Sequence, residues 1–490
     1  MAMLRQRSSV RDHAWLLIPL LFALVHEAIY AIEANSFPNN CDFAIMAEVA
    51  RRVAHGARLY VEAIDQKGPV LYLWWARMWR MCGSYHSFFA VMCVVEWAFR
   101  AVSTLFVCRV FHEEGRDEFG AMAAGLLLVL GCGSVGKVEM YAMPFVLYAL
   151  LLVRREIRGM RGSIAQYGVV GFGVAFTAMM KWPACLMFAL VAAYGIGTRC
   201  WRVVLRGVGI AAVSALMSVV ALLVWSLSYT DVFSICEQYL GASGVGYVAN
   251  IASSGLPCVD AIAWLKFLLF ATLSVASLVV VHMHLARRSL WWFFGGCSLL
   301  MVSFTLAISY YCIFSLPVIF IGLVEVSSVP IHRSRNRHVE GVGAGISVPY
   351  VCAAMSVVFI YALMVGISML STDEDATAVK SIVGDCDSVT CTYFVSVDTL
   401  SRMGLVSPYA QPAPNNVVGT GDDVRRDITD GRWRYVLRPR SGSARDLDVG
   451  DETAYLGHVW RVRFVSDYEV LLERADMTWN LMHCGEYEAF

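Results

Sequence analysis

Long apolar segments recur between residues 14 and 370 of this 490-residue chain, and they restrict its fold more than any other feature. A bilayer core is about 30 Å thick, so a helix needs roughly 20 apolar residues to cross it. The content of 58% hydrophobic and 16% charged residues is typical of a polytopic helical membrane protein. Hydropathy predicts roughly eleven spans, near 14–33, 87–110, 119–136, 138–153, 165–181, 183–198, 207–229, 261–283, 289–307, 311–328 and 345–370.

The positions of basic residues test this arrangement of spans, because basic residues favour the cytoplasmic side of a membrane. Arg5, Arg7 and Arg11 precede the first span, which predicts a cytoplasmic N-terminus. An odd number of spans then places residues 371–490 on the outer side. The later basic clusters all fall on the cytoplasmic side if the span count holds: Arg109/Arg116, Arg154/Arg155/Arg158/Arg161, Arg199/Arg202/Arg206, Arg287/Arg288 and Arg333/Arg335/Arg337.

The first outer loop, 34–86, breaks the charge rule, because it carries basic residues on the outer side: Arg51, Arg52, Arg58, Lys67, Arg77 and Arg80. Its apolar positions recur at helical spacing over 42–55 and 70–81, which predicts two short amphipathic helices, with Gly56 ending the first. We expect both helices to lie along the outer membrane face. The alternative is that Pro69–Met81 begins a membrane span.

The last part of the chain changes character. Residues 371–490 are polar and charged, with β-like runs at 392–397, 433–438, 459–465 and 468–474. We therefore expect a membrane domain over 1–370 and a small extracytoplasmic α/β domain over 371–490. The fifteen cysteines show no zinc-ligand spacing. The pairs Cys236/Cys258 and Cys386/Cys391 are left open as disulfides.

Five ionisable residues fall on the expected outer side: Asp42, Asp65, Lys67, Glu139 and Lys181. Each has an ordinary explanation: Asp42 as a helix N-cap, Asp65 and Lys67 as a polar turn, Lys181 as a snorkelling side chain. Glu139 is harder to explain, because a carboxylate in an apolar hairpin needs water or a partner. As a group they predict one cavity at the outer interface. Three ionisable residues within the spans are interpreted as helix-packing groups: His26, Glu27 and Glu96.

Several of these segments, in this order, resemble one family. They are Asp42, ARRVAHGARLYVEAIDQKGPVLY (50–72), VEMYAMPF (138–145), Lys181 and ISYYCIFSLPVIF (308–320). The sequence resembles the GT-C superfamily of polytopic glycosyltransferases, particularly bacterial relatives of protein O-mannosyltransferases and of the lipid A aminoarabinose transferase. The resemblance covers about 1–370. The family often has Asp-Glu at the first acid, where this chain has Asp42-Phe43, which speaks against a metal bound as in oligosaccharyltransferases.

The resemblance implies an inverting glycosyltransferase of the plasma membrane that moves a sugar from a polyprenyl-phosphate donor to a hydroxyl of an acceptor glycan, lipid or protein. Such chemistry needs a base for the acceptor and cations for the departing phosphate. Asp42 would be the base, and Glu139 would orient hydroxyls or assist it. Lys67, Lys181 and Arg58 would hold the phosphate. The expected lining of the sugar and prenyl chain is Tyr60, Asp65, Trp74, Trp75 and Tyr311.

The resemblance implies no cofactor, with a divalent metal as the alternative, and no nucleic-acid partner; membrane lipids surround the protein. The main rival is a transporter, flippase or polymerase of lipid-linked saccharides, and a third class is a scaffold without enzymatic activity. A transporter keeps charged or broken helices near the midplane of the membrane. Here the charges gather at the outer interface, which favours the enzyme.

Overall fold

The computed structural model describes residues 41–116, 120, 136–246, 261–304, 311–328, 374–384, 389–391, 426–430, 432–439, 444, 446–466 and 469–475. The chain divides into two compact units, which are described separately. The bundle unit consists of Met1–Tyr30, Cys93–Val224 and Leu256–Ile367. The sheet unit consists of Ala31–Met92, Trp225–Gly255 and Ser368–Phe490. The expected spans 14–33 and 345–370, and nearly all of 119–136, lie outside the described residues.

The bundle unit is helical. Among the described residues, four helical stretches are long and apolar enough to cross a membrane, at Ser87–Glu113, Ile164–Gly197, Trp201–Ser226 and Phe267–His284. They coincide with spans expected from hydropathy. The described helices are α4 (Tyr85–Glu113), α6 (Met143–Ile157), α7 (Ile164–Lys181), α8 (Leu186–Gly197), α9 (Trp201–Ser226), α12 (Ala261–His284), α13 (Ser289–Ser303) and α14 (Leu316–Ser328), with 3-10 turns η3 (Val138–Ala142), η4 (Trp182–Cys185) and η7 (Tyr311–Ser315).

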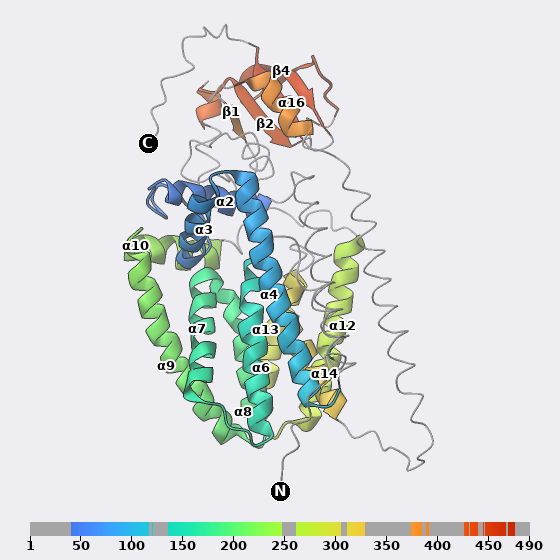
Figure 1. Ribbon diagram of the computed structural model, residues 1–490. Helices are drawn as coiled ribbons and strands as arrows, with labels where there is room; N and C mark the ends of the chain where they lie inside the picture. Colours follow the sequence, from blue (N-terminus) through green and yellow to red (C-terminus); the bar gives the residue numbers. More distant parts are fainter. Residues whose placement is uncertain are drawn as a thin grey trace, which may run out of the picture. The chain divides into compact units, whose positions relative to one another are not determined.

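The stretch from Ile164 to Gly197 is folded back on itself. In a straight helix, residues 174 and 185 would be about 16 Å apart along the axis, yet the Cys185 thiol lies 3.8 Å from the carbonyl oxygen of Val174. The turn is η4, where Trp182-Pro183 interrupts the helix because proline lacks an N–H donor. Helices α6, α7 and α8 run side by side in Figure 1. Two separate helices, α7 and α8, therefore occupy the stretches expected as the spans 165–181 and 183–198; that each crosses a membrane stays a prediction.

Glycines let α7 and α9 approach closely, as small residues do in membrane bundles. A Cβ added at Gly171 would lie 2.3 Å from the carbonyl oxygen of Ala211, and one at Gly207 would lie 2.3 Å from the Tyr167 ring. Since the first contact is with backbone, a side chain at position 171 forces the two helices apart.

We therefore expect Gly171→Ala to destabilise the protein by about 1–3 kcal/mol through overpacking. The measurement is the melting temperature of the purified protein in detergent. Gly209→Ala is the matched control, because a Cβ at Gly209 meets nothing within 4 Å. Equal melting temperatures for the two variants would contradict the close approach of α7 and α9.

In its described residues, the sheet unit combines short helices with a sheet of five strands in the order β1-β2-β5-β4-β3. Strands β1 and β2 are parallel and the other neighbours are antiparallel. The runs expected at 433–438, 459–465 and 468–474 are confirmed as strands, and 392–397 lies outside the described residues. The elements are α2 (Cys41–Ala54), α3 (Pro69–Cys82), α10 (Val232–Ser234), η5 (a π-helix, Ile235–Gly246), α16 (Glu374–Val383), β1 (Val389–Cys391), β2 (Tyr435–Pro439), β3 (Glu452–Tyr455), β4 (His458–Val465) and β5 (Glu469–Arg474).

Both faces of the sheet are buried, because side chains alternate along each strand. On β2, Tyr435 and Leu437 belong to one apolar cluster and Val436 to another. The first cluster contains residues of α16, which is drawn beside the sheet in Figure 1, and of α2. Its members are Ala44, Ile45, Val379, Val383, Val389, Tyr435, Leu437 and Leu471.

The apolar side of α2 is covered by protein, whereas a helix on a membrane surface turns this side to lipid; that α2 lies along the membrane face stays a prediction. Its apolar positions Ile45, Met46, Val49 and Val53 are fully covered by protein. Ile45 packs in the cluster of the sheet, and Phe43 packs against Trp75 of α3. The polar side of α2 and its end are as predicted: Glu48 pairs with Arg51 and Arg52, and Gly56 follows the helix with φ +106°.

Helix α3 is a separate short element and does not begin a span. Pro69 occupies its first turn, where the missing N–H has no helical partner to lose. Gly83 ends it in the left-handed conformation, with φ 70°. Its 14 residues extend about 21 Å, which is shorter than a bilayer core. The alternative that Pro69–Met81 starts a membrane helix is therefore wrong.

Candidate functional site

The residues singled out in the sequence fall into two groups. Glu139, Lys181 and Tyr311 belong to the bundle unit. The others belong to the sheet unit: Asp42, Arg58, Tyr60, Asp65, Lys67, Trp74 and Trp75. That Asp42, Asp65, Lys67, Glu139 and Lys181 line one cavity stays a prediction.

The first group brings together three segments that are distant in the sequence. Glu139 lies in η3, Lys181 ends α7 and Tyr311 begins η7. The Lys181 ammonium donates a hydrogen bond to Oε1 of Glu139 and lies 5.2 Å from the centre of the Tyr311 ring. A ring face attracts a cation at this distance. The lysine is therefore held between a carboxylate and an aromatic face.

The Glu139 carboxylate is buried, with 1% of its surface exposed. Its second oxygen, Oε2, has no hydrogen-bond partner among the described residues. An unpaired buried acceptor costs about 1–3 kcal/mol, so such atoms are rare unless they serve a ligand or a water molecule. Oε2 can accept a hydrogen bond from a hydroxyl that enters this site.

Glu96 fixes the turn that carries Glu139. Its Oε1 accepts hydrogen bonds from the Gly136 amide at 2.7 Å and from the Tyr141 hydroxyl at 3.0 Å, so it holds the chain on both sides of Glu139. Arg100 lies 3.8 Å from its other oxygen. From the sequence, Glu96 was expected only to be a helix-packing group. A carboxylate within an apolar helix was the signal for this larger role, since such a group needs partners.

The second group centres on the loop that precedes α3. Lys67 and Asp65 are both buried, and their Nζ and Oδ2 atoms are 3.3 Å apart. The Tyr60 hydroxyl donates to the carbonyl oxygen of Lys67 at 2.6 Å, and the Tyr72 hydroxyl donates to Oδ2 of Asp65. The loop thus closes on itself around one lysine and one carboxylate. Oδ1 of Asp65 has no hydrogen-bond partner among the described residues.

Tyr72 also belongs to this loop site, although it was not among the site residues expected from the sequence. Burial, and then the charge of Asp65, raise the pKa of Tyr72 well above its ordinary value. The hydroxyl therefore stays protonated at neutral pH and acts as a donor to Asp65. The signal was present in the sequence, because Tyr72 is the final tyrosine of the segment that resembles the GT-C superfamily.

Tyr60 and Arg58 begin the loop. Tyr60 has φ 67°, an uncommon conformation for a bulky residue that persists only where its surroundings impose it. Its N–H donates to the carbonyl oxygen of Ala63 at 2.8 Å. The Arg58 guanidinium lies 3.4 Å from Asp231, and both side chains are exposed. Hydrogen bonds from Ser234, followed by the charge of Arg58, lower the pKa of Asp231.

The aromatic residues of α3 differ in environment. Trp75, which was expected to border the substrate, is fully buried, with its ring 5.2 Å from Phe43 and 5.5 Å from Phe88. It is a core residue, because α3 packs this face against α2 and α4. Trp74 is half-buried. Asp42 lies in the first turn of α2. Among the described side chains, no three His, Cys, Asp or Glu residues lie close enough to hold a metal ion.

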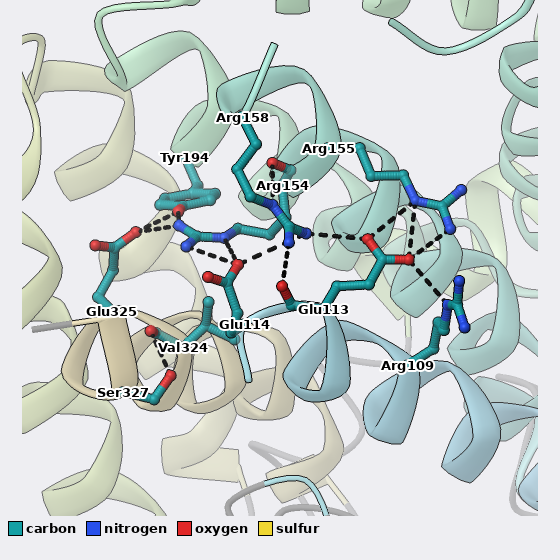
Figure 2. A network of polar contacts seen from close by, with 10 residues as sticks. All are labelled: Arg109, Glu113, Glu114, Arg154, Arg155, Arg158, Tyr194, Val324, Glu325 and Ser327. Carbon is teal, nitrogen blue, oxygen red and sulfur yellow. Dashed lines mark hydrogen bonds and ion pairs between the residues drawn. The ribbon is translucent and has the colours of Figure 1, made fainter. Parts of the chain in front are cut away.

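A cluster of arginines lies at the end of the bundle unit where α4 and α6 end and α7 begins. Figure 2 shows Arg109, Arg154, Arg155 and Arg158 of this cluster. Arg154 bonds to Glu114 at 2.9 Å and to Glu325 at 2.7 Å. Arg155 and Arg158 bond to Glu113 at 2.6 and 3.1 Å. Other bonds bring further basic segments to this end: Arg116 donates to the Ser327 carbonyl at 3.1 Å, and the amides of Ala286 and Arg287 donate to the Gly197 carbonyl. The described basic clusters therefore share one end, which is consistent with their expected common side of the membrane.

Comparison with known proteins gives weak similarities. No family model matches the chain, and no curated protein matches its sequence. One similar solved structure is the archaeal oligosaccharyltransferase AglB from Archaeoglobus fulgidus in complex with an inhibitory peptide and a dolichol-phosphate, with a TM-score of 0.48 and 11% identity over 88% of this chain and 70% of that chain. Another is the Archaeoglobus fulgidus oligosaccharyltransferase complex with Zn and sulfate, with a TM-score of 0.46 and 10% identity over 87% of this chain and 68% of that chain. These likenesses are too weak to assign the chain to a family.

Proposed function

We propose that this chain is a membrane glycosyltransferase that moves a sugar from a polyprenyl-phosphate donor to an acceptor hydroxyl at the outer membrane face. The observation that carries the proposal is the meeting of Glu139, Lys181 and Tyr311. The three residues come from separate segments, each chosen because it resembles the GT-C superfamily. Resemblance along the sequence does not by itself require contact in space, so their convergence supports a shared site.

The location of this site also supports the proposal. Lys181 ends α7, whose beginning at Ile164 adjoins the arginine end of the bundle. If the arginines face the cytoplasm, as basic residues favour, Lys181 and Glu139 face outward. Nucleotide sugars are absent there, so a lipid-linked donor suits a site at this interface. A flippase instead needs charged or broken helices near the midplane.

The chemistry follows from the charges. A departing phosphate needs cations. We assign three residues to this role: the partly buried Lys181, the buried Lys67 and the exposed Arg58. Glu139 is assigned to orient a hydroxyl through Oε2, and Asp42 to remove the proton of the acceptor. Tyr60, Asp65, Trp74 and Tyr311 complete the proposed lining. One displacement at the anomeric carbon inverts its configuration, and no metal is required.

The direct test uses purified protein in vesicles with a radiolabelled polyprenyl-phosphate sugar. Extraction of the lipid and polymer fractions shows where the label goes. Transfer of label to a new acceptor supports the glycosyltransferase. Label that only changes leaflet supports the flippase, and growth of a lipid-linked chain supports the polymerase. If the label stays on the donor and in its original leaflet, the proposal is contradicted, and a scaffold without enzymatic activity is the function that remains.

Lys67 gives a specific prediction for donor binding. Lys67→Ala removes the cation and is expected to weaken binding of the polyprenyl-phosphate sugar by about tenfold or more, whereas Lys67→Arg retains charge and most of the affinity. The measurement is a binding isotherm with the labelled donor.

Asp65 is fully buried beside Lys67. Lys67→Ala therefore leaves the Asp65 carboxylate without this cation, which destabilises the loop. The double variant Lys67→Met/Asp65→Asn is neutral and serves as the second test. Wild-type donor affinity in a folded Lys67→Ala or in the neutral double variant would assign Lys67 a structural role only.

A further inference from the structure

The arginine end of the bundle unit contains a pocket that the proposed reaction does not use. Its volume is about 470 Å³, and it lies between the ends of α4 and α6 and the start of α7. The residues that give it chemical character are Arg109, Glu113, Arg155, Arg158, Arg161 and Gln166. All of them belong to the bundle unit.

The pocket carries an excess of positive charge. Four arginines and one carboxylate line it, which leaves a formal charge of +3. Glu113 is already shared by Arg109 at 2.9 Å, Arg155 at 2.6 Å and Arg158 at 3.1 Å (Figure 2). The whole chain has zero formal net charge, so this positive potential is a local property of the pocket.

Several arginine donors are available to a ligand. Within the described part of the chain, Arg109 uses only Nε in bonding to protein, and Arg155 uses Nε and Nη2. The Nη1 and Nη2 groups of Arg109 and the Nη1 group of Arg155 therefore remain as donors. Arg161 is exposed at the pocket. Guanidinium groups bind phosphate oxygens in a bidentate manner, which makes phosphate the anion that this set fits best.

The surroundings indicate a phosphate attached to acyl chains. Met160 lines the pocket and is 47% exposed, and Ile164 at the start of α7 is 70% exposed. Further along the same helix, Val169 and Phe172 are 48% and 43% exposed. Ile164, Val169 and Phe172 all belong to α7, which begins beside the pocket and forms part of the apolar stretch Ile164–Gly197. A lipid whose phosphate enters the pocket can lay its chains against α7.

We propose that this pocket binds the phosphate of an anionic phospholipid in the leaflet at the arginine end of the bundle. Glu113 holds Arg109 and Arg155 in place, while their remaining N–H groups and Arg161 contact the phosphate. This inference is independent of the proposed transferase function, because it uses none of the residues assigned to that reaction. A free phosphate compound would accept hydrogen bonds from the same arginines, but it would not contact the exposed apolar residues of α7.

The test measures lipid binding to the purified full-length protein in a neutral detergent, by native mass spectrometry and by thermal stability. The probes are phosphatidylglycerol, phosphatidylcholine and inorganic phosphate. We expect phosphatidylglycerol to be retained and to raise the melting temperature, with little effect of the other two. Arg109→Gln/Arg161→Gln should weaken phosphatidylglycerol binding roughly 10- to 30-fold, since each basic residue contributes a few-fold to anionic lipid binding.

The matched control is Arg199→Gln/Arg206→Gln, which removes the same charge from exposed positions at the same end but outside the pocket. It should retain wild-type binding. If the first pair does not fold, Arg161→Gln alone serves, because Arg161 is exposed and its loss should still weaken binding several-fold. Equal losses in both pairs would show non-specific charge attraction and overturn the proposal. Equal retention of phosphatidylcholine, or saturation by inorganic phosphate alone, would overturn it as well.

Discussion

Asp42→Asn is expected to lower sugar transfer by roughly two to four orders of magnitude, the usual contribution of a general base. The substitution keeps the size of the side chain, but it removes the proton acceptor. Donor binding and expression should persist, because the proposed phosphate contacts belong to Lys67 and Lys181. The measurement is the turnover of a labelled polyprenyl-phosphate sugar, with donor affinity determined on the same preparation.

The control is Asp448→Asn, which removes an exposed carboxylate of the sheet unit that has no proposed role. Its turnover should equal that of the wild type. Near-normal turnover in Asp42→Asn would exclude Asp42 as the base. In that case Glu139→Gln is the next variant to assay, because Oε2 of Glu139 is a buried acceptor without a hydrogen-bond partner among the described residues.

Much of the fold could be predicted from the sequence because its signals are local. Apolar length predicted the four long helical stretches, and alternation predicted β2, β4 and β5. Gly56 was identified as the end of α2 because a left-handed residue after a helix favours glycine. These features depend on neighbours within a few residues, so one sequence is enough to find them.

The surroundings of α2 could not be predicted in the same way. Its apolar side suggested a membrane surface, yet Ile45 packs with Val379, Leu437 and Leu471, which lie more than 300 residues further along the chain. An apolar helix face needs cover, but its composition does not say whether lipid or protein provides it. The sequence therefore predicted the helix and its faces correctly, but it did not predict the protein residues that cover the apolar face.

In the candidate site, too, single residues could be predicted from the sequence, but their contacts could not. Resemblance picked out Glu139, Lys181 and Tyr311 one at a time, whereas their contact depends on how α7 and the turns η3 and η7 pack. Glu96 was assigned only to packing because its partners, Gly136 and Tyr141, are about 40 residues away. Pairing over such distances follows from tertiary structure, which sequence spacing does not encode.

The arginine end gives the second large effect, on stability. Arg154→Met is expected to destabilise the protein by about 3–5 kcal/mol, because it removes the buried arginine that pairs with both the buried Glu325 and the partly buried Glu114. Arg154 bonds to Glu114, Glu325 and Tyr194 at once, and 5% of its surface is exposed. The measurement is the melting temperature in detergent, followed by the denaturant concentration at half-unfolding.

A second substitution separates loss of the counter-charge from loss of packing. Glu325→Gln removes one of the two acids that Arg154 neutralises, while its amide still accepts from Tyr194. In Arg154→Met/Glu325→Gln a large part of the lost stability should therefore return, since only Glu114 then loses an ion pair, and it keeps Arg158 at 3.7 Å. Arg109→Met is the control, because Arg109 is 55% exposed and an exposed ion pair contributes at most about 1 kcal/mol. If the double variant is no more stable than Arg154→Met, packing of the arginine stem rather than its charge stabilises this end of the bundle.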